Sequence, residues 1–369
     1  MAVAMMTGAG ARRVDHADAE GADETAFLPS RRLPVWLILA GNAVMIASFW
    51  LIGAGGMMAK LILLLFWLLV LLGFLSGVRF SPAILVGGLV LGALITLILL
   101  GDGIGSEKIR LIGNLVMVPV GLACGFVIGR DCLRILMPAM GLYLILSSSF
   151  YLTHEGARLN HAFLFLGFFA LCSVCNRPWG RWMTMIAVIP VLISQTRIAV
   201  LAMLINGFGM LRLSRISAWL VMVIVGGMIA WASWQYLPRL LMIHDSGRLA
   251  FWQMFFDIWQ GGSETQRWLG FGAGSVEGIL SQSASFASFG ALHNDHFRIL
   301  FELGFVGAVL WLAGWGVLVW MVRGTWLSVC ILASVFVTMV TDNSLNYGHY
   351  LMACAMAAGI AAREGRPRG

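Results

Sequence analysis

The chain has 369 residues, of which 60% are hydrophobic and only 11% are charged, and its formal net charge is +7. A soluble domain carries roughly a quarter charged residues, so this composition excludes an ordinary soluble protein. Repeated long apolar runs predict instead an all-α polytopic membrane protein. The positive charges lie mostly in short segments between these runs, where membrane topology explains them, so we expect no nucleic-acid partner.

The first predicted element is a polar segment of both charge signs at 1–30, which we interpret as a disordered cytoplasmic tail rather than a signal peptide. A single transmembrane domain is predicted at 31–362, followed by a cytoplasmic C-terminal tail at 363–369. Within this domain, apolar runs predict about twelve transmembrane helices. These predicted spans are 33–52, 58–77, 82–100, 111–129, 132–150, 161–176, 182–196, 198–211, 216–235, 297–322, 325–341 and 346–362.

Basic residues predict the orientation of these spans. With the N-terminus inside the cell, 15 of the 24 Lys and Arg residues fall in cytoplasmic segments, as the positive-inside rule requires. Both termini are then cytoplasmic, which needs an even number of spans. In this topology six of the seven histidines lie on or near the outer face: His154, His161, His244, His293, His296 and His349.

The longest polar interruption, 236–296, separates the ninth and tenth spans and is predicted to be a periplasmic loop that carries the functional site. Asp245 or Ser246 can cap a helix that ends at Gly261. The helical spacing places four residues on one face: Arg248, Trp252, Phe255 and Trp259. We therefore expect an interfacial helix with aromatic anchors that lies on the membrane and holds Arg248 at the level of the head groups.

Residues suited to acid–base chemistry on a phosphate-bearing substrate gather at the outer face. His293, followed by Asn294, precedes the tenth span, and histidine can take a proton near neutral pH. Arg197 lies between two apolar spans, where a charge is costly, and Arg298 can pair with Glu302 across one helical turn. Guanidinium groups bind phosphate oxygens bidentately. The plainer alternative for His293 is a hydrogen-bonding residue at the membrane boundary.

Several common catalytic motifs are absent from the sequence. GFGAGS lacks the lysine of a P-loop, and there is no HExxH, paired DxD or GxSxG motif. Cys172 and Cys175 form a CxxC inside an apolar run with no second pair, which is typical of packing rather than of a metal site. We therefore expect a reaction without nucleotide, cofactor or metal.

Four motifs, in this order and spacing, carry a resemblance to a known family. They are SQTRIAVLAML (194–204), SGRLAFW (246–252), LGFGAGS (269–275) and HNDHFRILFELGFVG (293–307). The chain resembles the O-antigen ligase and O-antigen polymerase family of bacterial inner-membrane glycosyltransferases. The long outer loop between the ninth and tenth of twelve spans matches that family as well.

The resemblance implies an enzyme of surface polysaccharide or lipopolysaccharide biosynthesis that acts at the periplasmic face of the inner membrane. Its donor would be a glycan on undecaprenyl diphosphate, and its acceptor a hydroxyl of lipid A–core (ligase) or of a growing polysaccharide chain (polymerase). Arg197 and Arg248 would hold the diphosphate, and His293 would accept the proton of the acceptor hydroxyl. Asn294, Arg298 and Glu302 would support them. The residues leave open which of the two activities applies.

Two other classes of function compete with this interpretation. A transporter or flippase of lipid-linked glycans would place ionisable groups near the bilayer midplane and often shows repeated halves, whereas this chain has neither feature. A membrane scaffold without chemistry would tolerate the loss of Arg248 and His293. The enzyme hypothesis predicts that Arg197, Arg248 and His293 lie close together at the outer mouth of a groove open to lipid.

Overall fold

The computed structural model describes residues 32–52, 57–75, 81–147, 150–153, 156–175, 178–211, 248–282 and 291–365, with six isolated residues between 217 and 231. The predicted tail at 1–30 and nearly all of the ninth predicted span, 216–235, lie outside these ranges. Helices occupy the other eleven predicted spans. They are α1 (Val35–Ile52), α2 (Met57–Phe74), α3 (Pro82–Leu100), α4 (Gly105–Ile128), α5 (Asp131–Ser147), α6 (Ala162–Ser173), α7 (Pro178–Ile193), α8 (Arg197–Met210), α13 (Asp295–Val322), α14 (Trp326–Thr341) and α15 (Gly348–Glu364).

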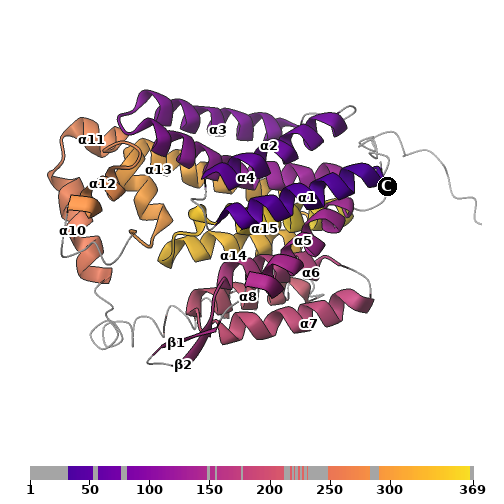
Figure 1. Cartoon of the computed structure of the whole chain (residues 1–369). Coiled ribbons are helices and arrows are strands. Elements are labelled where there is room, and N and C mark those ends of the chain that lie inside the picture. Colours follow the sequence, from indigo (N-terminus) through magenta and orange to yellow (C-terminus); the bar gives the residue numbers. More distant parts are fainter. Residues whose placement is uncertain are drawn as a thin grey trace, which may run out of the picture.

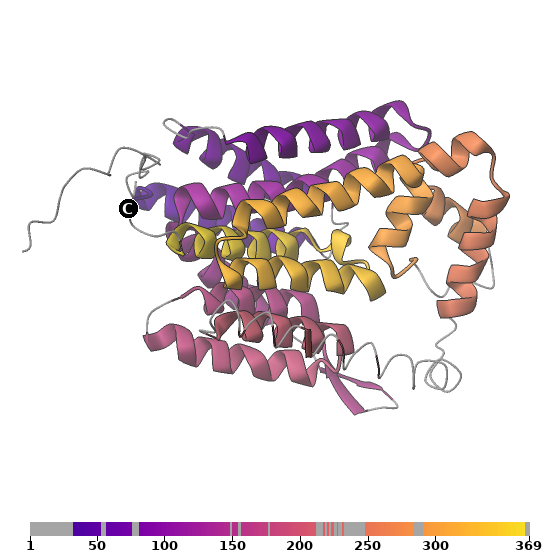
Figure 2. The ribbon, with the colours of Figure 1, turned by 180° about the vertical axis from the view of Figure 1, so that it is seen from behind.

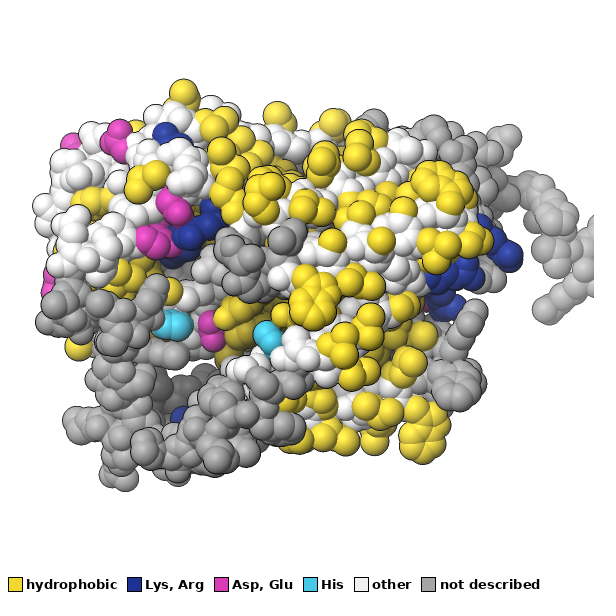
Figure 3. Space-filling view, in the orientation of Figure 1, with side chains coloured by type: hydrophobic (Ala, Val, Ile, Leu, Met, Phe, Trp, Pro, Cys, Tyr) yellow, Lys and Arg dark blue, Asp and Glu magenta, His cyan; other side chains and the backbone are white. Residues whose placement is uncertain are grey.

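The outer surface of this helical bundle is apolar. By length and composition, α2, α3, α4 and α13 could each cross a membrane, and shorter apolar helices accompany them. Large hydrophobic side chains are exposed along the bundle, such as Leu89 of α3 at 74% and Ile145 of α5 at 79%. Figure 3 shows hydrophobic side chains over the middle of the molecule, with charged side chains gathered toward its two ends. An apolar surface this extensive is typical of a protein surrounded by lipid.

Contacts between helix ends show which ends of three helices lie together. At one end of the bundle the Leu33 N–H donates to the Asp131 carboxylate (2.7 Å), and Arg130 pairs with Glu364. This end therefore carries the starts of α1 and α5 and the end of α15, and Figure 1 shows the C-terminus there. The opposite end carries a small helical cap formed by α10 (Arg248–Gly261), α11 (Glu264–Leu269) and α12 (Ser275–Gln282).

Helix α15 forms the centre of the bundle and packs against α4, α6 and α14. Its residues from Gly348 to Ala362 are all buried, and small side chains allow its neighbours to approach closely. A Cβ atom added at Gly125 of α4 would overlap the carbonyl of Met356 in α15, and one at Gly359 would overlap the carbonyl of Leu122. Glycine at both positions therefore brings the two backbones into contact.

A β-hairpin was not expected in an all-α protein. Strands β1 (Phe150–Thr153) and β2 (Gly156–Leu159) pair antiparallel, with Phe150 opposite Leu159. They connect α5 to α6, and Figure 2 shows them projecting beside α7 and α8. The segment is rich in residues that favour extended backbone, but it is too short to give a strong alternating pattern.

The glycine-rich turn between α11 and α12 joins the cap to α13. Helix α13 is interrupted at Gly304, whose φ of 67° and ψ of −170° are reached almost only by glycine. This interruption leaves two carbonyl groups of α13 to accept hydrogen bonds from the turn: Phe301 from the Phe271 N–H and Glu302 from the Gly272 N–H, both 3.0 Å. The turn therefore holds the cap against α13 through backbone hydrogen bonds.

Replacing Gly304 with alanine is expected to destabilise the protein by more than about 2 kcal/mol, because strained backbone costs about 1–3 kcal/mol per residue and a Cβ here would also overlap the Trp268 carbonyl. Thermal unfolding of purified protein in detergent measures the loss. Gly316→Ala is the matched control, because Gly316 lies in the same helix with open space around it and should stabilise slightly. Equal melting temperatures for the two variants would contradict this account of the turn.

The prediction that α10 lies on the membrane with an aromatic face is wrong in one respect. Within the described residues the helix runs from Arg248 to Gly261, and the predicted caps Asp245 and Ser246 lie outside them. Phe251 and Phe255, however, are fully buried in a separate hydrophobic cluster with Val276, Leu280, Leu292 and Phe301. Trp252 donates its indole N–H to the Leu292 carbonyl (2.7 Å). The cap therefore has its own core, and the amphipathic pattern reflects packing against α12 and α13.

Candidate functional site

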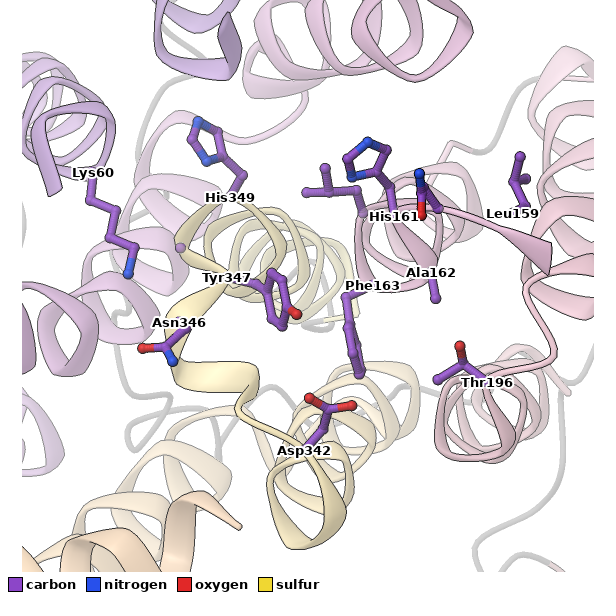
Figure 4. A pocket seen from close by; sticks show the side chains of 13 residues that line it. Lys60, Leu159, His161, Ala162, Phe163, Thr196, Asp342, Asn346, Tyr347 and His349 are labelled. Carbon is purple, nitrogen blue, oxygen red and sulfur yellow. The ribbon is translucent and has the colours of Figure 1, made fainter. Parts of the chain in front are cut away.

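A cavity of about 390 Å³ lies at the cap end of the bundle, among α2, α6, α8 and α15 (Figure 4). Its volume is within the roughly 300–1,000 Å³ of small-molecule sites. Phe163 and Tyr347 give it aromatic surface. Its polar lining consists of Lys60, Asn160, His161, Thr196, Asp342, Asn346 and His349.

The first turn of α8 lies at one side of this cavity. Thr196, the N-cap residue of α8, lines the cavity, and Arg197 is the first residue of the helix and is exposed. No side chain caps this helix start. The helix dipole and the positive charge of Arg197 favour an anion near this helix start.

His293 is held against the connection between α14 and α15. Its φ of 53° is in the left-handed region, and its backbone N–H donates to the Asn343 side-chain oxygen (2.9 Å). Its Nδ1 lies 3.9 Å from the Asp342 carboxylate, which itself lines the cavity.

Buried Asp295 also holds the connection between α14 and α15. Its carboxylate accepts the Leu345 N–H (2.8 Å). With the bond from His293 to Asn343, this contact fastens the start of α13 to 342–347. The segment that carries Asp342 is thus positioned by two hydrogen bonds.

Neither Arg197 nor His293 lines the cavity itself, but each is next to a residue that does. Arg197 directly follows the lining residue Thr196, and His293 neighbours the lining residue Asp342. Arg248 begins α10, but its side chain lies outside the described part of the chain, so its place beside the other two stays a prediction.

The predicted pairing of Arg298 with Glu302 is confirmed, with Nε and Oε1 3.2 Å apart. Arg298 also contacts Glu277 of α12 (2.9 Å), and the Glu302 carboxylate accepts the Gly274 N–H (3.2 Å). The Arg298 side chain is only 7% exposed, and that of Glu302 is fully buried. Both residues therefore join the cap to α13.

Asn294 and His296 also hold the start of α13. The Asn294 side chain caps the helix by accepting the Phe297 N–H (2.9 Å). His296 accepts the Trp311 indole N–H at Nδ1 (3.0 Å), so its Nε2 donates to the Phe336 carbonyl (3.0 Å). Both ring nitrogens of His296 are therefore engaged in holding α13 against α14.

Sequence reasoning did not select Lys60, Tyr347 or Asn346 as site residues, although all three line the cavity. Lys60 had a usable signal, because a lysine in the first turn of an apolar helix is costly and often functional. The other two lie in a short polar connection whose placement depends on the fold. Asp342 lies in the same connection.

Comparison with known proteins adds no assignment to this geometry. No model of a known protein family matches the chain and no curated protein is similar to it, so the interpretation of the site depends on the residues of this chain.

Proposed function

We propose that the protein is a twelve-span bacterial inner-membrane glycosyltransferase with its site at the periplasmic face. It transfers a glycan from undecaprenyl diphosphate to an acceptor hydroxyl of lipid A–core or of a growing polysaccharide. The observation that carries the proposal is that Thr196 and Asp342 line one cavity, with Thr196 at the start of α8 and the His293 ring 3.9 Å from the Asp342 carboxylate. An anion-binding helix start and a histidine with a carboxylate neighbour suit this chemistry.

The reaction breaks one bond and forms one. The acceptor oxygen attacks the anomeric carbon of the donor sugar, with inversion, as the bond from that carbon to the diphosphate breaks. His293 takes the proton of the acceptor hydroxyl, and the nearby Asp342 stabilises the resulting imidazolium. The diphosphate leaves with the electron pair, and Arg197, with Arg248, stabilises its growing charge. The energy comes from the diphosphate bond, so no nucleotide is consumed.

The distribution of charge favours this function over transport. Lys60 is in the first turn of α2, and Glu107 and Arg110 are near the start of α4. On the face that Figure 3 shows, charged side chains gather toward the two ends of the bundle, whereas a transporter usually holds its substrate through polar groups near the midplane. The polar cavity at one end suits a reaction on one side of the membrane.

A transfer assay with purified protein in lipid nanodiscs tests the proposal. The donor is an undecaprenyl diphosphate-linked repeat unit, with EDTA and without nucleotide, and lipid A–core is present or absent. Growth of chains on the carrier alone identifies a polymerase, and glycan on lipid A–core identifies a ligase. Intact donor in every condition, together with donor flipping in proteoliposomes, would establish the transporter instead.

Replacing Arg197 with glutamine is expected to lower the transfer rate roughly 10- to 100-fold, the value of a hydrogen bond to a charged group. Arg197→Lys should recover part of the rate, because lysine restores the charge but not the bidentate geometry. Arg267→Gln is the control, since Arg267 is an exposed arginine of α11 that does not line the cavity. An unchanged rate in Arg197→Gln would show that the start of α8 does not bind the donor.

A further inference from the structure

The cavity has a second side that the proposed diphosphate site does not use. Figure 4 shows Lys60 across the cavity from Thr196, with the Tyr347 ring between them. Asn346 lies on the same side as Lys60. Lys60 belongs to α2, and Asn346 and Tyr347 belong to the connection between α14 and α15.

Lys60 supplies a cation without an acidic partner. Its Nζ donates to the side-chain oxygen of Asn114 (2.8 Å), and it forms no ion pair with any described carboxylate. Lys60 is half-buried, so its charge has lost part of its hydration and gained only a neutral acceptor. Such a group binds an anionic ligand favourably, because the ligand restores the missing interaction.

Tyr347 supplies an aromatic surface. Phe163 stacks against its ring with centroids 5.1 Å apart and an interplanar angle of 26°. Tyr347 is nevertheless 42% exposed, so part of its ring remains open to a ligand. An aromatic ring held rigidly from one side packs well against the apolar C–H face of a sugar ring, since little conformational entropy is lost.

Asn346 supplies a hydrogen-bond donor. Its side chain lines the cavity, and its oxygen is buried without a described donor, whereas its amide nitrogen is not among the buried atoms. The amide N–H groups can therefore donate to a ligand oxygen. A cation, an aromatic ring and an amide donor on one side of a cavity match a sugar that carries an acidic group.

We propose that this side of the cavity binds a saccharide with a carboxylate or phosphate substituent. The sugar ring lies against Tyr347, the Asn346 amide donates to a sugar oxygen and the acidic group pairs with Lys60. Assigning this saccharide to the acceptor rests on the proposed function, since His293 beside Asp342 would then lie between donor and acceptor. The binding itself does not require catalysis.

Saturation-transfer NMR on the protein in nanodiscs tests this inference with three soluble probes: glucuronate, glucose 6-phosphate and glucose. At least one acidic sugar should bind roughly tenfold more tightly than glucose, and Lys60→Met should remove this preference. Lys60→Gln keeps a donor for Asn114 and should behave in the same way. Tyr347→Ala should weaken all three sugars, whereas Arg267→Met should change none of them.

Inorganic diphosphate distinguishes the two sides of the cavity. It should bind the wild type and Lys60→Met equally, and Arg197→Gln should weaken it. Equal binding of acidic and neutral sugars would overturn the inference, as would a loss of diphosphate binding in Lys60→Met. If acidic sugars bind but diphosphate does not, the proposed function is contradicted, whereas the saccharide site is supported.

Discussion

Replacing His293 with asparagine is expected to lower the rate of glycan transfer by about 10²- to 10⁴-fold, the usual contribution of a positioned general base. Asparagine removes the titratable ring but tolerates the left-handed backbone of this position, where φ is 53°. It also keeps the backbone N–H that donates to Asn343. The fold should therefore survive, and the loss can be attributed to the proton acceptor.

The measurement is single-turnover transfer in nanodiscs, which separates the chemical step from substrate binding. Donor binding should change little, since the base does not hold the diphosphate. His293→Ala should be equally inactive and somewhat less stable, because alanine is less tolerant of positive φ. A His293→Asn variant with the wild-type rate and melting temperature would show that His293 is not the base. His293 would then be a hydrogen-bonding residue at the membrane boundary.

Hydropathy was sufficient to place most of the helices. An apolar run of about 20 residues bounded by charges can form few structures other than a transmembrane helix. Helices accordingly occupy every predicted span for which the structure describes more than isolated residues. The pairing of Arg298 with Glu302 was equally local, because residues four apart on a helix always share a face. Such features depend on the sequence nearby and need no knowledge of the tertiary structure.

Features that depend on a second element could not be predicted in this way. The sequence gives the aromatic residues of α10 a common face, but lipid and protein both favour such a face, and only the fold shows that Phe255 packs against Phe301. The interruption of α13 at Gly304 likewise depends on the turn that donates to the freed carbonyls. Lys60 lines the cavity because α2 packs beside α4, where the Asn114 side-chain oxygen accepts a hydrogen bond from the Lys60 ammonium group.

The cap is joined to the bundle by a network of charges. Arg110 of α4 and Arg298 of α13 both contact Glu277 of α12, and Glu107 pairs with Arg110. The same helix α13 carries Asp295, which fixes the connection that holds Asp342. Cap, cavity and His293 are thus linked through the first turns of one helix.

Replacing Arg298 with methionine is expected to destabilise the protein by about 3–5 kcal/mol, the cost of leaving a buried charge unpaired. The variant leaves the fully buried Glu302 carboxylate with the Gly274 N–H as its one remaining described partner. Glu277 is less affected, since it is partly exposed and keeps its contact with Arg110. Unfolding in detergent, followed by circular dichroism against denaturant concentration, measures the free-energy difference.

A second substitution distinguishes the lost charge pair from lost packing. Arg298→Met/Glu302→Gln removes the unpaired charge, while the glutamine oxygen can still accept the Gly274 N–H, so the double variant should be more stable than Arg298→Met alone. Arg267→Gln, at an exposed site in the cap, should change stability by less than about 0.5 kcal/mol. If the double variant were no more stable than Arg298→Met, the contribution of Arg298 would lie in the packing of its side chain, and the buried carboxylate would not be what its guanidinium stabilises.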